Sequence, residues 1–66
     1  MTFKEAYEKM LEGYKIRRLP WKGYWKWEND TIMIYCWDGE ILDIRDTKDV
    51  KMTIDNMMYD DWCVIY

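Results

Sequence analysis

The 66-residue sequence contains no histidine, no serine and no glutamine. Serine hydrolases and enzymes that use a histidine base are therefore excluded. The three glycines, Gly13, Gly23 and Gly39, are too scattered for a phosphate-binding loop or a dinucleotide fingerprint, because both need glycines clustered at one strand-to-helix turn. These absences predict a protein that is not an enzyme and has no catalytic residues.

Cysteine is also scarce. The two cysteines, Cys36 and Cys63, do not form a CxxC motif, and the chain contains no histidine. A zinc site would therefore need carboxylates for its remaining ligands. We therefore expect no metal and no cofactor. Their spacing allows a disulfide, but residues 1–5 do not form an apolar signal segment and no run reaches membrane-spanning length. We expect reduced cysteines in a cytoplasmic protein with no membrane partner.

Residues that form hydrophobic cores are abundant: half of the chain is hydrophobic and 18% is aromatic. A domain of this size buries only about 60% of the surface of its unfolded chain, so it needs a dense core or a partner subunit. The sequence predicts one domain over residues 1–66 and favours a homo-oligomer.

The N-terminal segment predicts an amphipathic helix, because apolar side chains recur at helical spacing while charged ones lie outside their stripe. Thr2 and Glu5 are spaced as a capping box, Glu5 and Lys9 as an i,i+4 pair, and Gly13 can end the helix in a left-handed conformation. The stripe consists of Phe3, Ala6, Tyr7, Met10, Leu11 and Tyr14. We assign it to the core, with Tyr7 as the member whose hydroxyl can also reach a ligand.

After this helix, short extended segments alternate with turn residues, which is typical of an antiparallel sheet. Asn29-Asp30 and Asp38-Gly39 are natural hairpin turns. We expect strands over residues 14–18, 24–27, 31–37, 40–45 and 62–66. The predicted fold class is α+β, with one N-terminal helix packed on a small antiparallel sheet of four to five strands.

The segment before the last strand is expected to be a polar loop over residues 46–52, followed by a short helical turn. Thr53 is the expected cap of this turn, which runs through Met57 and Met58.

The strand expected over residues 31–37 is apolar on both faces. One face carries Ile32, Ile34 and Cys36, and the other carries Met33, Tyr35 and Trp37. A single helix covers only one face of a small sheet, so the other needs cover from a second subunit, a ligand or both. Loops of the same chain are the alternative cover.

The charges are distributed unevenly. The net charge is −3, yet half of the ten basic residues lie within residues 15–26, which contain no acid. An acidic surface disfavours long nucleic acid, whereas a local positive patch can hold a small anion. Cations alternate with aromatic rings in this segment, which suits a nucleotide: cations hold phosphate and indoles stack on purines. Alternatively, Trp21 and Trp25 belong to the core, and the cations are solvated partners of the acidic remainder.

Landmarks at both ends of the chain match a known pattern. The opening landmarks are Phe3, Ala6, Leu11, Gly13, Ile16, Arg18 and Trp21, and the closing ones are Asp61-Trp62 after a short helical segment. In order and spacing they resemble the second Thoeris anti-defence family of phage and bacterial proteins. The likeness covers both ends and is loose across a shorter middle.

This resemblance implies a non-enzymatic protein that sequesters cyclic ADP-ribose-type signals of bacterial immunity, and in some members cyclic dinucleotides. It also implies oligomers, usually tetramers, with ligand pockets between subunits. Arg18 and Trp21 match the family's Arg and Trp, and Asp61 and Trp62 match its terminal pair.

We therefore expect a site in which Trp21 stacks on a base, Arg18 and Arg17 hold phosphate, and Tyr7 or Trp62 closes the pocket. The expected ligand-binding residues are Tyr7, Arg17, Arg18, Trp21, Asp61 and Trp62. An alternative function is an acidic inhibitor that mimics nucleic acid and blocks a bacterial defence nuclease. A third is a small hydrolase that uses paired carboxylates such as Asp60-Asp61.

Overall fold

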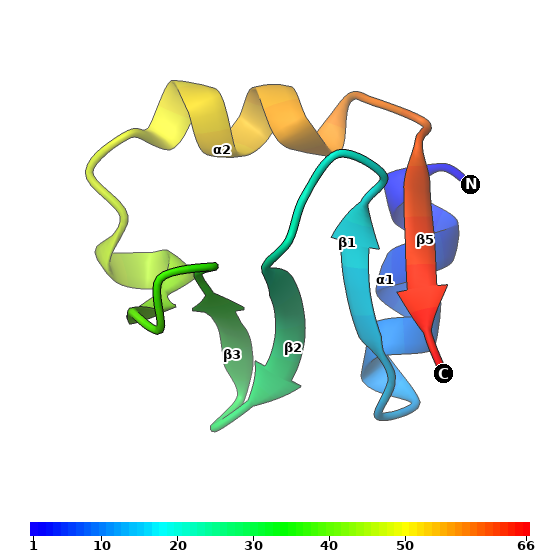
Figure 1. Ribbon diagram of the computed structural model, residues 1–66, viewed down its shortest axis with the longest axis horizontal. Coiled ribbons are helices and arrows are strands. Elements are labelled where there is room, and N and C mark those ends of the chain that lie inside the picture. The colour runs from blue at the N-terminus through cyan, green and yellow to red at the C-terminus, as the bar shows by residue number, and fades with distance from the viewer.

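Helix α1 (Phe3–Leu11) packs on one face of a five-stranded antiparallel sheet with strand order β4-β3-β2-β1-β5 (Figure 1). This computed structural model describes all residues from Met1 to Tyr66. The strands are β1 (Lys15–Arg18), β2 (Tyr24–Glu28), β3 (Thr31–Tyr35), β4 (Ile41–Asp43) and β5 (Trp62–Ile65). The last strand returns to pair with β1, so it forms an edge of the sheet. The α+β prediction, with the N-terminal helix on the sheet, is confirmed.

Local signals place both ends of α1. The Thr2 hydroxyl accepts from the Glu5 amide at 3.2 Å, and the Glu5 carboxylate accepts from the Thr2 amide at 3.0 Å, which completes the expected capping box. Gly13 follows the helix with φ +106°, as expected. The expected Glu5–Lys9 pair is not formed, because the cap holds Glu5; Lys9 instead lies 3.7 Å from Glu12.

The apolar stripe of α1 is shorter than the sequence predicts. Ala6 and Met10 are fully buried, but Leu11 is 48% exposed because it lies at the margin of the stripe. Tyr14 falls beyond the last helical residue, so its side chain leaves the helical period and packs edge-on against Tyr66 at 5.2 Å. The stripe therefore reaches the core only as far as Met10.

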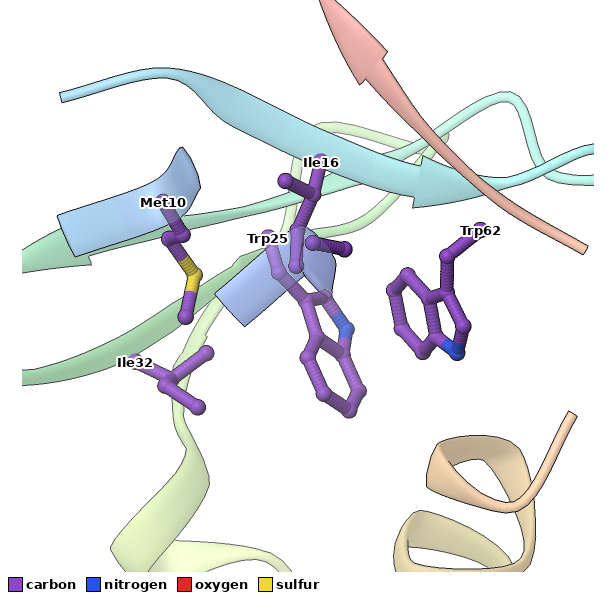
Figure 2. Packing of buried hydrophobic residues seen from close by; sticks show 6 residues of the cluster. Met10, Ile16, Trp25, Ile32 and Trp62 are labelled. Carbon is purple, nitrogen blue, oxygen red and sulfur yellow. The ribbon is translucent and has the colours of Figure 1, made fainter. Parts of the chain in front are cut away.

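The core lies between α1 and the sheet and is built by five elements. Residues paired across strands share a face, and the pairs Ile16–Trp25 and Trp25–Ile34 run across the side that α1 covers. Figure 2 shows Met10, Ile16 and Ile32 gathered around Trp25, with Trp62 beside it. The buried residues are Ala6, Met10, Ile16, Trp25, Ile32 and Trp62.

Both expected hairpin turns are present. Asn29 and Asp30 have φ values of 54° and 59°, the left-handed pair that a two-residue hairpin between β2 and β3 requires. Gly39 also has positive φ, and the Cys36 amide donates to the Glu40 carbonyl at 2.8 Å. This turn is wider than expected, so β3 ends at Tyr35 and β4 begins only at Ile41.

Helix α2 (Val50–Met57) begins earlier than predicted. Asp49 is its N-cap, and its carboxylate accepts from the Met52 amide at 3.0 Å. Thr53, the expected cap, lies inside the helix and donates to the Asp49 carbonyl at 2.9 Å, so that prediction and the loop expected through residue 52 are wrong. After the short 3₁₀ helix η1 (Ile44–Asp46), α2 carries the chain across one end of the sheet to β5 (Figure 1). Neither helix has the length and apolarity needed to cross a membrane.

The sheet face opposite α1 carries no helix (Figure 1). Its side chains cover one another: the rings of Tyr24 and Tyr35 stack at 4.8 Å, and Lys15 Nζ lies 4.8 Å from the Tyr24 ring centroid. We call this the open face and define it by Lys15, Arg17, Tyr24, Lys26, Met33 and Tyr35. The expected alternation holds from Ile32 to Tyr35, whereas Cys36 and Trp37 lie beyond the end of β3.

Candidate ligand cavity

A cavity of about 450 Å³ lies between α2, the connection from β1 to β2, and the adjoining ends of β2 and β3. We call it the α2 cavity. Its aromatic walls come from Trp21, Tyr24, Trp25, Tyr35 and Trp37. Polar groups are contributed by Thr47, Thr53 and Asn56, and Lys22 is the single charged residue in the lining. The volume and the mixture of aromatic walls with few polar groups are typical of a small-molecule site.

The loop that carries Trp21 is fixed from two sides. Arg17 Nη1 donates to the Leu19 carbonyl at 3.0 Å and to the Trp21 carbonyl at 2.6 Å. On the other side, Gly23 approaches the Tyr35 carbonyl so closely that no Cβ fits there without a shift of the backbone. The Arg17 side chain therefore holds the loop by its backbone carbonyls, and position 23 requires glycine because a side chain there would clash with Tyr35.

Trp21 belongs both to the cavity and to the core. Its ring centroid lies 5.5 Å from that of Trp25 and 5.1 Å from that of Trp62. Trp62 is only 2% exposed, and its indole nitrogen donates to the Asn56 carbonyl at 3.1 Å. Trp21 remains half-buried, so part of its ring is available to the cavity, whereas Trp62 supports the wall from behind.

Arg18 forms an ion pair within the chain. Its Nε and Nη2 donate to the two Asp61 carboxylate oxygens at 2.8 and 3.0 Å, and its Nη1 donates to Asn56 Oδ1 at 2.8 Å. Tyr59 lies over the guanidinium at 3.8 Å. The hydrogen bond from Arg18 lowers the pKa of Asp61, and the same bond raises the pKa of Arg18. All three guanidinium nitrogens are therefore engaged, and a phosphate would have to compete with Asp61 and Asn56.

Four of the six expected ligand-binding residues are brought together at this end of the sheet: Arg18, Trp21, Asp61 and Trp62. Arg17 lies on the open face and reaches under the loop. Tyr7 is separate, because it lines a different groove of about 560 Å³ between α1 and the C-terminal end of α2. The polar residues of that groove are Thr2, Lys4 and Asp60, and the Asp60 carboxylate makes it less favourable for a phosphate than the α2 cavity, whose lining has no carboxylate.

Sequence reasoning missed several residues of the cavity. The sequence pattern indicates Tyr35 and Trp37 only as part of one face of a strand, and Tyr24 lies within the cationic segment of residues 15–26 with no signal of its own. Asn56 gave no signal, because the helix that carries it was expected to be a short turn.

Cys36 also lines the cavity. Burial raises the pKa of its thiol, and the nearby carboxylates of Asp38 and Glu40 raise it further. The potential ligand atoms of these three residues lie within 4.8 Å of one another, and Asp38 and Glu40 are exposed. The turn accounts for this proximity, because Cys36 pairs with Glu40 through the backbone and Asp38 Oδ1 accepts from the Glu40 amide at 3.0 Å. The second cysteine, Cys63, lies on β5 and forms no disulfide with Cys36.

Comparison of the sequence with protein-family models and with curated proteins finds no match, so the function is argued from the geometry of the α2 cavity.

Proposed function

We propose that the protein binds a small cyclic nucleotide signal in the α2 cavity and holds it without turnover, so that bacterial anti-phage immunity is inhibited. The ligand is of the cyclic ADP-ribose type or a cyclic dinucleotide, and the proposed place of action is the cytoplasm of the host cell. Sequestration needs only affinity and slow release, so it is compatible with a chain that has no histidine or serine.

The observation that carries this proposal is the aromatic lining with Trp37 at its rim. Trp37 is 80% exposed although tryptophan has the largest side chain of all residues and is usually mostly buried. An exposed ring beside other aromatic walls provides a stacking surface for a base. Lys22 supplies a positive charge for phosphate, and no carboxylate is among the lining residues, although Asp38 and Glu40 lie beside Cys36.

Trp37→Ala is the sharpest test, because an exposed side chain contributes little to folding. Loss of one stacking ring is expected to weaken binding by roughly 5- to 150-fold. Calorimetric titration with cyclic ADP-ribose and with cyclic dinucleotides measures the change. Tyr66→Ala is the matched control, since Tyr66 is an 87% exposed aromatic residue outside the cavity. Equal binding by the Trp37 variant and the parent contradicts the proposal.

Trp21→Ala is expected to weaken binding too, but its ring also packs on Trp25 and Trp62. Removal of a large ring from such a cluster costs about 3–5 kcal/mol of stability. A melting curve recorded beside each titration is therefore required, and a Trp21 variant that binds as the parent does removes Trp21 from the site.

The absence of turnover is tested by incubation of the protein with each nucleotide, denaturation and analysis of the released molecule. An intact nucleotide supports sequestration, and a cleaved one supports a hydrolase instead. If no nucleotide is retained and a salt-sensitive complex with a defence nuclease forms, the acidic-inhibitor alternative replaces the proposal.

We further propose that the open face mediates assembly into a homo-oligomer, with a tetramer favoured. Tyr24, Met33 and Tyr35 on this face are only partly buried, and no helix packs over them. Native mass spectrometry of protein from cells that produce immune signals reports the number of subunits and any retained nucleotide together. A stable 8.3 kDa monomer contradicts this part of the proposal.

A further inference from the structure

The side-chain amide of Asn56 has one end engaged and one end free. Its Oδ1 accepts from Arg18 Nη1 at 2.8 Å, while its backbone carbonyl accepts from the Trp62 indole at 3.1 Å. Its Nδ2 makes no hydrogen bond within the chain and is not a buried atom. Asn56 is one of the residues that line the α2 cavity, and Nδ2 is its one side-chain group without a partner in the chain.

Arg18 dictates this orientation. A guanidinium can only donate hydrogen bonds, so the opposite orientation of the amide would place NH₂ against Nη1 and lose the contact. Arg18 itself cannot turn away easily, because two hydrogen bonds to Asp61 hold it and only 14% of its side chain is exposed. The ion pair thus keeps the amide nitrogen, and not the amide oxygen, free.

We propose that Asn56 determines base specificity in the α2 cavity and that Arg18 is the positioning residue that fixes its amide. In this arrangement Nδ2 faces position 6 of the purine, where it donates to the oxygen of a 6-oxo purine, such as hypoxanthine or guanine, but opposes the 6-amino group of adenine, which is also a donor. At N7 the same donor would not discriminate, because both kinds of purine carry that acceptor. Of the two proposed ligand classes, the inference therefore favours a cyclic dinucleotide with 6-oxo bases over cyclic ADP-ribose, whose base is adenine. This inference rests on the proposed function, because it assumes that the nucleotide binds in this cavity.

The test compares two probes that differ at purine position 6, cyclic di-IMP and cyclic di-AMP. The parent protein is expected to bind the 6-oxo probe roughly 5- to 150-fold more tightly, because a 6-amino group leaves the Nδ2 donor without an acceptor. Asn56→Asp keeps the shape of the side chain and the acceptor for Arg18, but it replaces the free NH₂ by an oxygen. We expect this variant to reverse the preference, since the new oxygen accepts from a 6-amino group.

The ratio of the two affinities is the readout, because the added negative charge repels the phosphates of both probes equally. Asp55→Asn is the matched control: it changes the charge by one unit at the neighbouring position, where the side chain pairs with Lys51 outside the cavity. The control is expected to leave the ratio unchanged. A ratio in the Asn56 variant equal to that of the parent overturns the inference.

Arg18→Lys tests the positioning role separately. A lysine can still pair with Asp61 but cannot hold both Asp61 oxygens and Asn56 in one plane. The amide then becomes free to turn. The ratio of the affinities for the 6-oxo and 6-amino probes is therefore expected to fall toward one, while both probes still bind. An unchanged preference in this variant assigns Arg18 a purely structural role and overturns that part.

The two proposals fail in different ways. If neither probe binds the parent, or if Trp37→Ala has no effect on binding, the cavity is not the nucleotide site and the proposed function fails together with this inference. If Trp37→Ala weakens binding of both probes while Asn56→Asp leaves their ratio unchanged, the proposed function stands and only the specificity inference is overturned.

Discussion

The guanidinium of Arg18 contacts both carboxylate oxygens of Asp61, although 43 positions separate the two residues in the sequence. The pair joins the end of β1 to the residue that precedes β5, and the Asp61 carbonyl also accepts from the Leu19 amide at 3.1 Å. Through Asn56 the same guanidinium reaches α2. One side chain thus holds together three segments around the α2 cavity.

Asp61→Asn is expected to lower the melting temperature at neutral pH, because the variant leaves the largely buried positive charge of Arg18 without its counter-charge. Arg18 lowers the pKa of Asp61 in the folded protein, so this pair stabilises the fold above the ordinary carboxyl pKa, near pH 4. Its contribution is lost as the pH falls through the lowered value. Melting curves from pH 7 to pH 2 should therefore converge for parent and variant, and a constant difference over this range contradicts the assignment.

Met10→Ala is expected to destabilise the protein by about 2–5 kcal/mol, because Met10 is fully buried between α1 and the sheet. Leu11→Ala provides the control on the same helix, since Leu11 is 48% exposed, and it should cost less than about 1 kcal/mol. Urea unfolding measures both values. Equal losses at the two positions would contradict the observed boundary of the apolar stripe.

The features of the fold that sequence could predict are those set by neighbouring residues. The capping box of Thr2 and Glu5 needs only a spacing of three, and the Asn29-Asp30 turn needs only residues that tolerate positive φ. The start of α2 was missed because Asp49 and Thr53 are both good cap residues, and only the folded chain decides between them.

The roles of charged residues could not be predicted in the same way. From the sequence alone, Arg18 in a cationic aromatic segment indicates phosphate binding, because a guanidinium is a strong hydrogen-bond donor in any surroundings. Its actual partner, Asp61, is remote in sequence and meets it only because β5 pairs with β1. The same pairing brings Asn56 to the cavity, which explains why a helix position with no motif becomes part of the site.

Asp43 should titrate with a pKa of about 2. The side chain of Arg45 is the main cause: Nη2 donates to Oδ2 at 2.6 Å, and the Arg45 amide and the Thr31 hydroxyl add further hydrogen bonds. Arg45→Ala is expected to raise this pKa, though not to its ordinary value, because the backbone amide and Thr31 remain. NMR titration of the carboxyl carbon measures the change, and an unchanged midpoint contradicts the assignment.

Cys36 should react slowly with iodoacetamide, because burial and, to a smaller extent, Asp38 and Glu40 raise the pKa of its thiol and so reduce the thiolate fraction. Asp38→Asn and Glu40→Gln are expected to speed the reaction modestly, since each removes a negative charge while burial persists. Alkylation rates at pH 8, followed by mass spectrometry of the two cysteine-containing peptides, measure both effects.

The same reaction reports on the cavity, because Cys36 lines it and Cys63 does not. Cys63 lies on β5, where its thiol donates to the Arg17 carbonyl at 3.4 Å, so it serves as an internal control in the same molecule. A bound nucleotide is expected to slow the alkylation of Cys36 several-fold and to leave Cys63 unaffected. Equal protection of both thiols would indicate global stabilisation. Binding without protection of Cys36 would place the nucleotide outside the α2 cavity.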